Sequence, residues 1–164
     1  MLFEKISFAE FAKHFDSGDE GYVMAKDAYD KIILPHRATP GSAGYDFYLP
    51  INVCLTPDRP TVIPTGIRVQ IDHGYFLMCV PRSGLGFKYG VRLRNGCGII
   101  DEDYFFADNE GHIMASVTTE VPVSLKAGDR FMQGIFIPYG VTIDDIPIKQ
   151  ARTGGFGSTG GAAS

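Results

Sequence analysis

The sequence has few cysteines and no excess of basic residues, and each shortage excludes a class of protein. Its three cysteines, Cys54, Cys79 and Cys97, are odd in number and show no Cys-x-x-Cys spacing. This argues against a disulfide framework and a zinc ribbon, so we expect three reduced, buried thiols. The formal net charge is −4 and the isoelectric point about 5.5. The wide basic surface that tight polyanion binding requires is missing, and we expect no nucleic-acid partner.

Long apolar runs and internal repeats are also missing. No uncharged stretch approaches the length that spans a membrane, and residues 1–5 lack the basic start and apolar run of a signal peptide. No period of about 20–50 residues indicates a solenoid or propeller. The 164 residues, 45% of them hydrophobic, have the size and composition of one globular domain. We therefore expect a cytoplasmic protein without a membrane partner.

The hydrophobic pattern changes near residue 30. Phe8, Phe11 and Phe15 recur three and four residues apart, and Ser7 with Glu10 has the spacing of a capping box. This predicts a short amphipathic helix that ends at the Asp-Ser-Gly of residues 16–18. Further on, β-rich runs alternate with Gly, Pro and Asp. The strands are expected at residues 62–71, 75–80, 113–117 and 131–138, and turns at 72–74 and 126–129.

Many short strands at this spacing are typical of an all-β barrel or sandwich of the jelly-roll type. We therefore divide the chain into a helical extension (residues 1–30), a β domain (31–150) and a flexible C-terminal arm (151–164). The arm is the one low-complexity segment. Because it is too polar and flexible to pack on its own subunit, it is suited to reach a neighbouring one.

The arm carries groups that suit a nucleotide. Residues 152–160 read Arg-Thr-Gly-Gly-Phe-Gly-Ser-Thr-Gly. The glycines let backbone N–H groups turn toward phosphate oxygens, Ser158 and Thr159 add hydroxyl donors, and Phe156 offers a flat face for a base. The alternative is a disordered tail without a ligand. Two upstream segments favour the nucleotide lid.

The first of these segments, residues 81–86, reads Pro-Arg-Ser-Gly-Leu-Gly and follows a predicted strand. Arg82 can bind phosphate oxygens in a bidentate manner. Ser83 and nearby N–H groups can bind a bridging oxygen that gains charge as its bond to phosphorus breaks. The alternative is an ordinary β-turn with an exposed arginine.

The second segment, residues 95–104, places glycines around a β-rich core that ends in a carboxylate cluster. Asn95 and the backbone of a hairpin here can pair with a base edge. Asp101 is placed to act as a general base that orients a water molecule, and Tyr104 can pack flat on a sugar. The alternative is that the acids at 101–103 only cap a turn.

Two weaker features complete the set. Asp46 stands at a predicted strand start, where a carboxylate can hold water on a metal or only fix a loop. Asp129 and Arg130 lie at a tight turn, a pair that is more often structural than functional. Gln133 lies on the strand that follows, and a half-buried glutamine usually satisfies a backbone group.

Taken in order, these segments resemble the five motifs of the homotrimeric dUTP pyrophosphatases, or dUTPases. The matching segments are residues 43–46, 81–86, 98–104, 128–130 with Gln133, and 154–160, and residues 37–42 resemble the family's entry into its first motif. Five ordered matches are far more specific than one. The resemblance implies a jelly-roll subunit, a homotrimer with three active sites at subunit interfaces, and Mg²⁺-dependent hydrolysis of dUTP to dUMP and pyrophosphate.

The resemblance also implies residue roles in the chemistry. Asp101 would activate the water that attacks the α-phosphorus, and Ser83 would donate to the oxygen between the α and β phosphorus atoms. Arg82, Gly84 and Gln133 would bind the phosphates, with Gln133 and Ser83 counted among the catalytic residues. In addition, Asp46 would act on Mg²⁺ through a water molecule, or at the subunit contact.

Other matching positions would recognise the nucleoside. The groups that would read the Watson–Crick edge of uracil are Asn95 and the backbone of Gly98, Ile99, Ile100 and Asp101. Tyr104 would pack on the deoxyribose and exclude a 2′-hydroxyl. Phe156 of a neighbouring subunit's arm would stack on uracil. The arm residues that would close over the γ-phosphate are Arg152, Gly157, Ser158 and Thr159.

The sequence departs from the family in three places. The family usually follows its motif-three tyrosine with Arg-Gly-Glu, whereas residues 105–112 intervene here. The usual tail arginine is replaced by Ala151, with Arg152 one place later. Residues 1–30 exceed the usual start. The N-terminal helix and residues 105–112 are therefore candidate contact surfaces for a protein partner.

Two rival functions follow from the same residues. A dCTP deaminase shares the fold but needs a glutamate placed for proton transfer at the cytosine amine, and the intact Ile-Asp-Glu-Asp-Tyr at 100–104 argues against it. A dUTP-binding sensor with little turnover would act through the N-terminal helix or the segment at 105–112. Such a sensor would bind dUTP without releasing pyrophosphate.

Overall fold

The computed structural model describes residues 1–146, which form short strands with a few helices. The N-terminal elements are β1 (Leu2–Lys5), α1 (Phe8–Ala12) and α2 (Asp19–Asp30). The strands and helices that follow are β2 (Tyr45–Tyr48), β3 (Val53–Leu55), β4 (Thr61–Pro64), β5 (Ile67–Gln70), β6 (Tyr75–Pro81), α3 (Ser83–Tyr89), β7 (Arg92–Leu93), β8 (Gly98–Ile100), the 3₁₀ helix η1 (Glu102–Phe106), β9 (Met114–Thr118), β10 (Val123–Leu125) and β11 (Arg130–Pro138). This is the all-β class with helices at its N-terminus that the sequence predicts.

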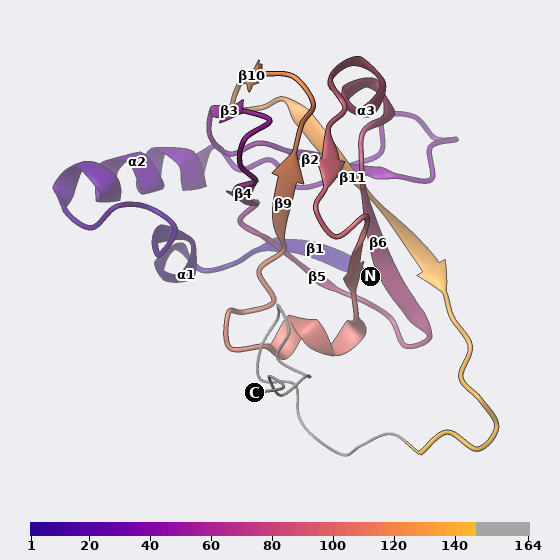
Figure 1. The fold of residues 1–164 in the computed structure, drawn as a ribbon. Coiled ribbons are helices and arrows are strands. Elements are labelled where there is room, and N and C mark those ends of the chain that lie inside the picture. Colours follow the sequence, from indigo (N-terminus) through magenta and orange to yellow (C-terminus); the bar gives the residue numbers. More distant parts are fainter. Residues whose placement is uncertain (147–164) are drawn as a thin grey trace, which may run out of the picture.

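The strands form small antiparallel sheets around one core (Figure 1). A four-stranded sheet has the order β2-β11-β6-β8, a three-stranded sheet the order β4-β9-β7, and β1-β5 and β10-β3 form two-stranded pairs. Inward positions alternate with outward ones, so that strands of both main sheets bury apolar side chains in one cluster. Phe47, Leu77 and Ile63 are fully buried there. This burial is the main favourable term in folding.

The registers of β6 with β11 and β8 fix the direction in which the chain leaves the sheet. Cys79 is paired with Gly98 and Leu77 with Ile100, so β6 and β8 run antiparallel. The chain therefore leaves β6 toward α3 at one end of the sheet, and leaves β8 toward η1 at the other. Figure 1 shows α3 and the helix that follows β8 at opposite ends of the molecule.

Three of the four expected strands are confirmed, as β6, β9 and β11. The fourth, expected over residues 62–71, is two strands, β4 and β5. Gly66 separates them in a left-handed conformation (φ +70°), and the buried Thr65 hydroxyl donates to the carbonyl of Ile113. Both expected turns are confirmed, because Tyr75 N–H donates to Asp72 and Asp129 N–H to Lys126.

The cysteine expectation holds only in part. All three cysteines are free, but of these only Cys79 is buried; Cys97 is half-buried and Cys54 is exposed. Cys54 is exposed because it is the outward-facing central residue of β3. Burial raises the pKa of the Cys79 thiol to about 12, so this side chain is a protonated, inert part of the core.

The predicted N-terminal helix is confirmed as α1, where the Ser7 side chain accepts a bond from Glu10 N–H. The sequence pattern did not predict β1 or α2. Four residues of β1 are too few to show an alternation, although they pair with β5 as part of the barrel. Helix α2 buries only small residues, Gly21, Ala25 and Ala28, which give little periodic signal.

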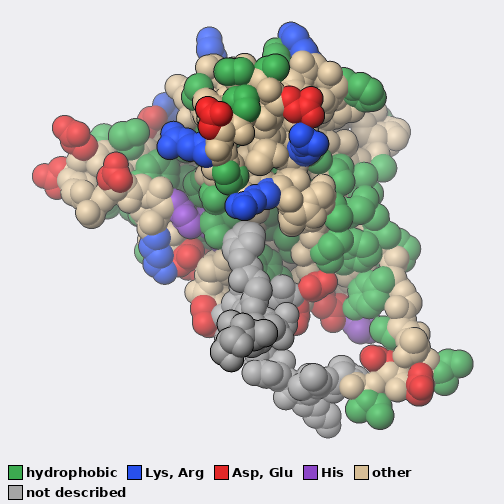
Figure 2. Space-filling model, in the orientation of Figure 1, with side chains coloured by type: hydrophobic (Ala, Val, Ile, Leu, Met, Phe, Trp, Pro, Cys, Tyr) green, Lys and Arg blue, Asp and Glu red, His purple; other side chains and the backbone are tan. Residues whose placement is uncertain are grey.

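None of the helices within residues 1–146 combines the length and apolar character needed to cross a membrane. On the face shown in Figure 2, Lys and Arg side chains are scattered among Asp and Glu, and acidic side chains gather at the outer end of α2. This distribution agrees with the small negative net charge of the whole sequence.

Candidate active site

The buried carboxylate of Asp46 joins two arginines at one end of the main sheet. Asp46 lies on β2 and is 6% exposed. One of its oxygens lies 3.1 Å from Arg82 Nε and the other 3.1 Å from Arg130 Nη1. A buried charge needs such partners, because water cannot solvate it. The carboxylate thus holds two guanidinium groups side by side at this end of the sheet. Their positive charge makes the end suitable for binding an anion.

Gln133 lies beside this cluster because of the strand register. It is paired with Asp46 of β2 on one side and with Val80 of β6 on the other. Gly44 makes room for it: a Cβ added at Gly44 would lie 2.4 Å from Gln133 Oε1. A glycine at position 44, two residues before Asp46, therefore has a steric reason, since a larger residue there would displace the Gln133 side chain.

Helix α3 supplies the remaining phosphate-binding candidates. Arg82 is its N-cap and Ser83 its first residue, and the helix ends at Gly90 in the left-handed conformation. The segment is thus a helix rather than the β-turn of the alternative interpretation. Ser83 and Gly84 are exposed, with nothing within 4 Å of a Cβ added at Gly84. We call Asp46, Arg82, Ser83, Arg130 and Gln133 the phosphate half-site.

A second group of predicted residues surrounds a hollow of about 390 Å³ beside β8. Asn95, Gly98 and Ile100 line it, whereas Ile99 faces outward and is 48% exposed. The other lining residues are Cys79, Leu93, Arg94, Ile113, Met114, Ala115, Ser116 and Met132. A Cβ added at Gly98 would lie 3.2 Å from Cys79 Cβ, so this backbone lies tight against β6. Exposed backbone and one amide beside an apolar hollow suit a flat heterocycle.

The acidic cluster lies directly beyond this hollow. Asp101 is exposed and stands at the N-cap position of η1, and Glu102 and Asp103 lie in the first turn of this helix. Tyr104 is 5% exposed, and its hydroxyl donates to the carbonyl of His112 at 2.8 Å. We call Asn95, Gly98, Ile100, Asp101 and Tyr104 the base half-site.

Ser83 of the phosphate half-site and Asp101 of the base half-site do not meet within one chain. Cys79 of β6 is paired with Gly98 of β8, and the two strands run in opposite directions. Ser83 lies four residues beyond Cys79 toward one end of the sheet, whereas Asp101 lies three residues beyond Gly98 toward the other end. Seven residues of extended chain correspond to roughly 20 Å. A serine and an aspartate that were expected to act on one α-phosphorus therefore lie at opposite ends of the same sheet.

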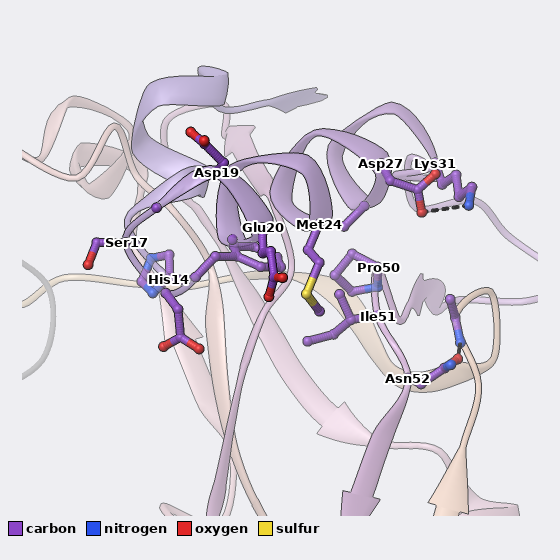
Figure 3. A pocket seen from close by; sticks show the side chains of 16 residues that line it. His14, Ser17, Asp19, Glu20, Met24, Asp27, Lys31, Pro50, Ile51 and Asn52 are labelled. Atoms are coloured by element: carbon purple, nitrogen blue, oxygen red, sulfur yellow. Dashed lines mark hydrogen bonds and ion pairs between the residues drawn. The ribbon is translucent and has the colours of Figure 1, made fainter.

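A larger hollow lies elsewhere on the described chain. It measures about 880 Å³ and separates α2 from the loop at residues 50–52. Figure 3 shows Met24 of α2 pointing toward Pro50 and Ile51 across it, with Asp27 and Lys31 paired at its edge. No predicted site residue lines it. Its size alone therefore does not identify it as the site.

The remaining candidates lie outside residues 1–146. Arg152, Phe156, Gly157, Ser158 and Thr159 are beyond the described part of the chain. Within residues 1–146, no three His, Cys, Asp or Glu side chains are grouped to hold a metal ion. Arg130 was missed as a site residue, because its neighbour Asp129 suggested a local pair. Asp129 instead accepts a bond from Lys126 N–H in the turn.

Comparison with known families and sequences gives a consistent result. The dUTPase family model matches residues 30–160. The deoxyuridine 5′-triphosphate nucleotidohydrolase of Lactococcus lactis is 40% identical over 142 residues, which cover 84% of this chain and 95% of that protein. The enzyme of the same name from Bordetella avium is 36% identical over 143 residues, covering 82% of this chain and 93% of that protein.

Solved structures share the fold. The crystal structure of dUTPase from Streptococcus mutans is 33% identical and covers 87% of this chain and 98% of that chain, with a TM-score of 0.65. A D95N mutant dUTPase from phage phi11 of S. aureus, described with a structural Mg(II) ion, is 19% identical and has a TM-score of 0.60. It covers 74% of this chain and 92% of that chain. The jelly-roll prediction is thereby confirmed.

Proposed function

The chain belongs to the dUTPase family and hydrolyses dUTP, and we propose that it does so at sites built between the subunits of a homotrimer. The separation of Ser83 from Asp101 within one chain carries this proposal. Ser83 and Asp101 lie roughly 20 Å apart along β6 and β8. Only a different chain can bring an Asp101 to the phosphate half-site. A cyclic trimer repeats that contact three times and closes it.

The phosphate half-site is proposed to bind the triphosphate. Arg82 and Arg130 offer guanidinium groups whose orientation Asp46 fixes through 3.1 Å contacts. Because guanidinium groups match phosphate oxygens in a bidentate manner, a fixed orientation lowers the entropy lost on binding. Ser83 donates to the bridging oxygen that gains charge as the bond to the α-phosphorus breaks, and Gln133 and the backbone at Gly84 add donors.

The base half-site of a neighbouring subunit is proposed to hold the deoxyuridine. Asn95 and the backbone at Gly98–Ile100 read the edge of uracil, in a hollow whose size limits what the ring can carry. Asp101 takes a proton from the attacking water as general base. Tyr104 packs on the deoxyribose, where it leaves no room for a 2′-hydroxyl.

Mg²⁺ is proposed to arrive on the triphosphate rather than in a protein cage. Residues 1–146 group no three metal-ligating side chains. This fits Mg²⁺, which keeps several waters and is usually held by one or two carboxylates together with substrate phosphates. Because each oxygen of the Asp46 carboxylate contacts an arginine, Asp46 is proposed to orient these arginines rather than to hold the ion through a water molecule. When bound, the ion offsets negative charge on the triphosphate.

The test is the release of pyrophosphate from dUTP, dCTP, dTTP and UTP, with and without Mg²⁺, by the protein and by Asp101→Asn. We expect release from dUTP alone, dependent on Mg²⁺ and lost in the variant. Binding of dUTP without release would instead indicate a sensor, and conversion of dCTP to dUTP a deaminase. Equal activity in Asp101→Asn would refute the assignment of the base.

A further inference from the structure

The N-terminal extension and residues 105–112, two places where the sequence departs from the dUTPase motifs, pack against each other. Ser7 N–H donates to Glu110 Oε2 at 2.7 Å, and Ser7 Oγ donates to Glu110 Oε1 at 2.6 Å. The carboxylate thus binds the N-cap of α1 from a position 103 residues further along the chain. These bonds lower the pKa of Glu110 from its ordinary value.

His112 makes the second contact between these segments. Its imidazole is fully buried, accepts a bond from Gly66 N–H at Nε2 (2.9 Å), and packs against the rings of Phe11 and His14. A third contact joins them through β5: the guanidinium of Arg68 pairs with Glu4 and lies 4.4 Å from the ring centre of Phe105. Residues 105–112 are therefore held by the extension on several sides.

The backbone at Glu110 is strained. Within residues 1–146 it is the one residue other than glycine with a positive φ, +57°. A side chain in the left-handed region costs free energy unless the surroundings enforce it. The two hydrogen bonds to Ser7 hold Glu110 in this conformation. The next residue, Gly111, also has a positive φ of +72°.

The segment that Glu110 holds also binds the Tyr104 hydroxyl. The Tyr104 hydroxyl donates to the carbonyl of His112 and accepts from Asn109 Nδ2, both at 2.8 Å. These two partners stand immediately before Glu110 and two residues after it. Any shift of Glu110 therefore moves both groups that hold the tyrosine hydroxyl.

We propose that Glu110 is a positioning residue for substrate selectivity: by fastening residues 105–112 to the N-cap of α1, it fixes the Tyr104 ring where it excludes a 2′-hydroxyl. This inference rests on the proposed function, since it takes Tyr104 to face the deoxyribose. It assigns the N-terminal extension and residues 105–112 to one function. The extension supports residues 105–112, and these hold the tyrosine.

The experiment measures kcat and KM of the full chain for dUTP and UTP in Glu110→Gly, Ser7→Ala and Glu110→Gln. Glu110→Gly removes the carboxylate and relieves the backbone. We expect KM for dUTP to rise, kcat to stay within about twofold, and the preference for dUTP over UTP to fall about three- to tenfold. Ser7→Ala, which removes the other partner of the contact, should lower the preference for dUTP over UTP by a similar factor. Glu110→Gln keeps an acceptor oxygen and should therefore retain more of this preference than Glu110→Gly.

Asp108→Gly is the matched control, because Asp108 is an exposed acid of the same segment, two residues before Glu110. It should leave the dUTP:UTP preference unchanged. Thermal unfolding of each variant separates lost fold from lost positioning: a role in stability alone would lower the melting temperature without changing the preference, and would overturn the inference.

Tyr104→Ala separates this inference from the function on which it rests. If Tyr104→Ala lowers the preference for dUTP while Glu110→Gly and Ser7→Ala do not, the positioning role is refuted and the proposed function stands. If Tyr104→Ala also leaves the preference unchanged, Tyr104 does not exclude UTP, and both are refuted. A fall in all three variants, with Asp108→Gly unaffected, supports the inference.

Discussion

At the scale of single residues, His112 should make stability depend on pH. Burial, followed by the nearby His14, lowers the pKa of its imidazole to about 3, against the opposing effect of Glu110. The folded protein therefore keeps His112 neutral at a pH where the unfolded chain, with a pKa near 6.5, binds a proton. The contribution of this group to stability is complete above about pH 6.5 and falls as the pH is lowered toward 3.

We expect the free energy of unfolding to fall by about 2 kcal/mol from this group between pH 6.5 and 5, as about 1.4 kcal/mol accompanies each pH unit. The measurement is urea unfolding of the protein and of His112→Gln at both values. Glutamine keeps an acceptor for Gly66 N–H but does not titrate, so its pH slope should be smaller. Equal slopes would show that His112 does not cause the loss.

Asp46 carries a second residue-scale prediction. Asp46→Asn leaves two arginines that compete for one neutral oxygen, so Arg82 loses its fixed orientation. We expect KM for dUTP to rise about tenfold, while the Mg²⁺ concentration at half-maximal activity stays unchanged. Asp129→Asn is the control, because Asp129 bonds the turn at Lys126 and not the arginines. A raised Mg²⁺ requirement with an unchanged KM would assign Asp46 to the metal instead.

At the scale of the elements, the turn after η1 depends on Gly111. It has a φ of +72°, and an added Cβ would lie 2.8 Å from both Phe105 Cα and the Tyr104 carbonyl oxygen. Backbone atoms on both sides prevent easy relaxation. Gly74 (φ +84°) offers the comparison, because nothing lies within 4 Å of a Cβ there.

We therefore expect Gly74→Ala to lower the free energy of unfolding by about 1 kcal/mol, from backbone strain alone, and Gly111→Ala by about 3 kcal/mol or more. Chemical denaturation of both variants measures the difference. Similar losses would mean that residues 104–111 can move away from the added methyl group, and would weaken the description of this segment as a rigid support.

At the scale of the whole molecule, sites shared between chains predict complementation. Ser83→Ala and Asp101→Asn should each be inactive alone. In trimers refolded from an equal mixture, a site takes Ser83 from one chain and Asp101 from another, so about a quarter of the sites receive both native residues. We expect about a quarter of normal dUTP hydrolysis to return. No recovery in mixed trimers would place both residues of a site in the same chain.

The C-terminal arm provides a second prediction for the assembly. A chain that ends at Gln150 keeps every described strand but lacks the segment at 152–160. We expect a trimer by size-exclusion chromatography with light scattering, and loss of most activity, because the arm closes over the nucleotide. Dissociation of the truncated chain would show that the arm holds the assembly together as well.

The extent of sequence-based prediction differs among these scales. Strands with clear alternation, such as β6, β9 and β11, and the capped helix α1 were predictable, since local spacing and side-chain bonding define them. Helix α2 was not, because its buried residues are glycine and alanine. Arg130 was missed because its partner, Asp46, is 84 residues distant in sequence.

The sequence by itself determined the chemistry: the residue types of the five motifs, their order, and hence the family and the reaction. These depend on which groups are present and on short spacings. Only the tertiary structure decided that Asp46 holds two arginines, that the extension supports residues 105–112, and that Ser83 and Asp101 lie at opposite ends of one sheet. Such facts depend on strand register and long-range packing, which no local pattern encodes.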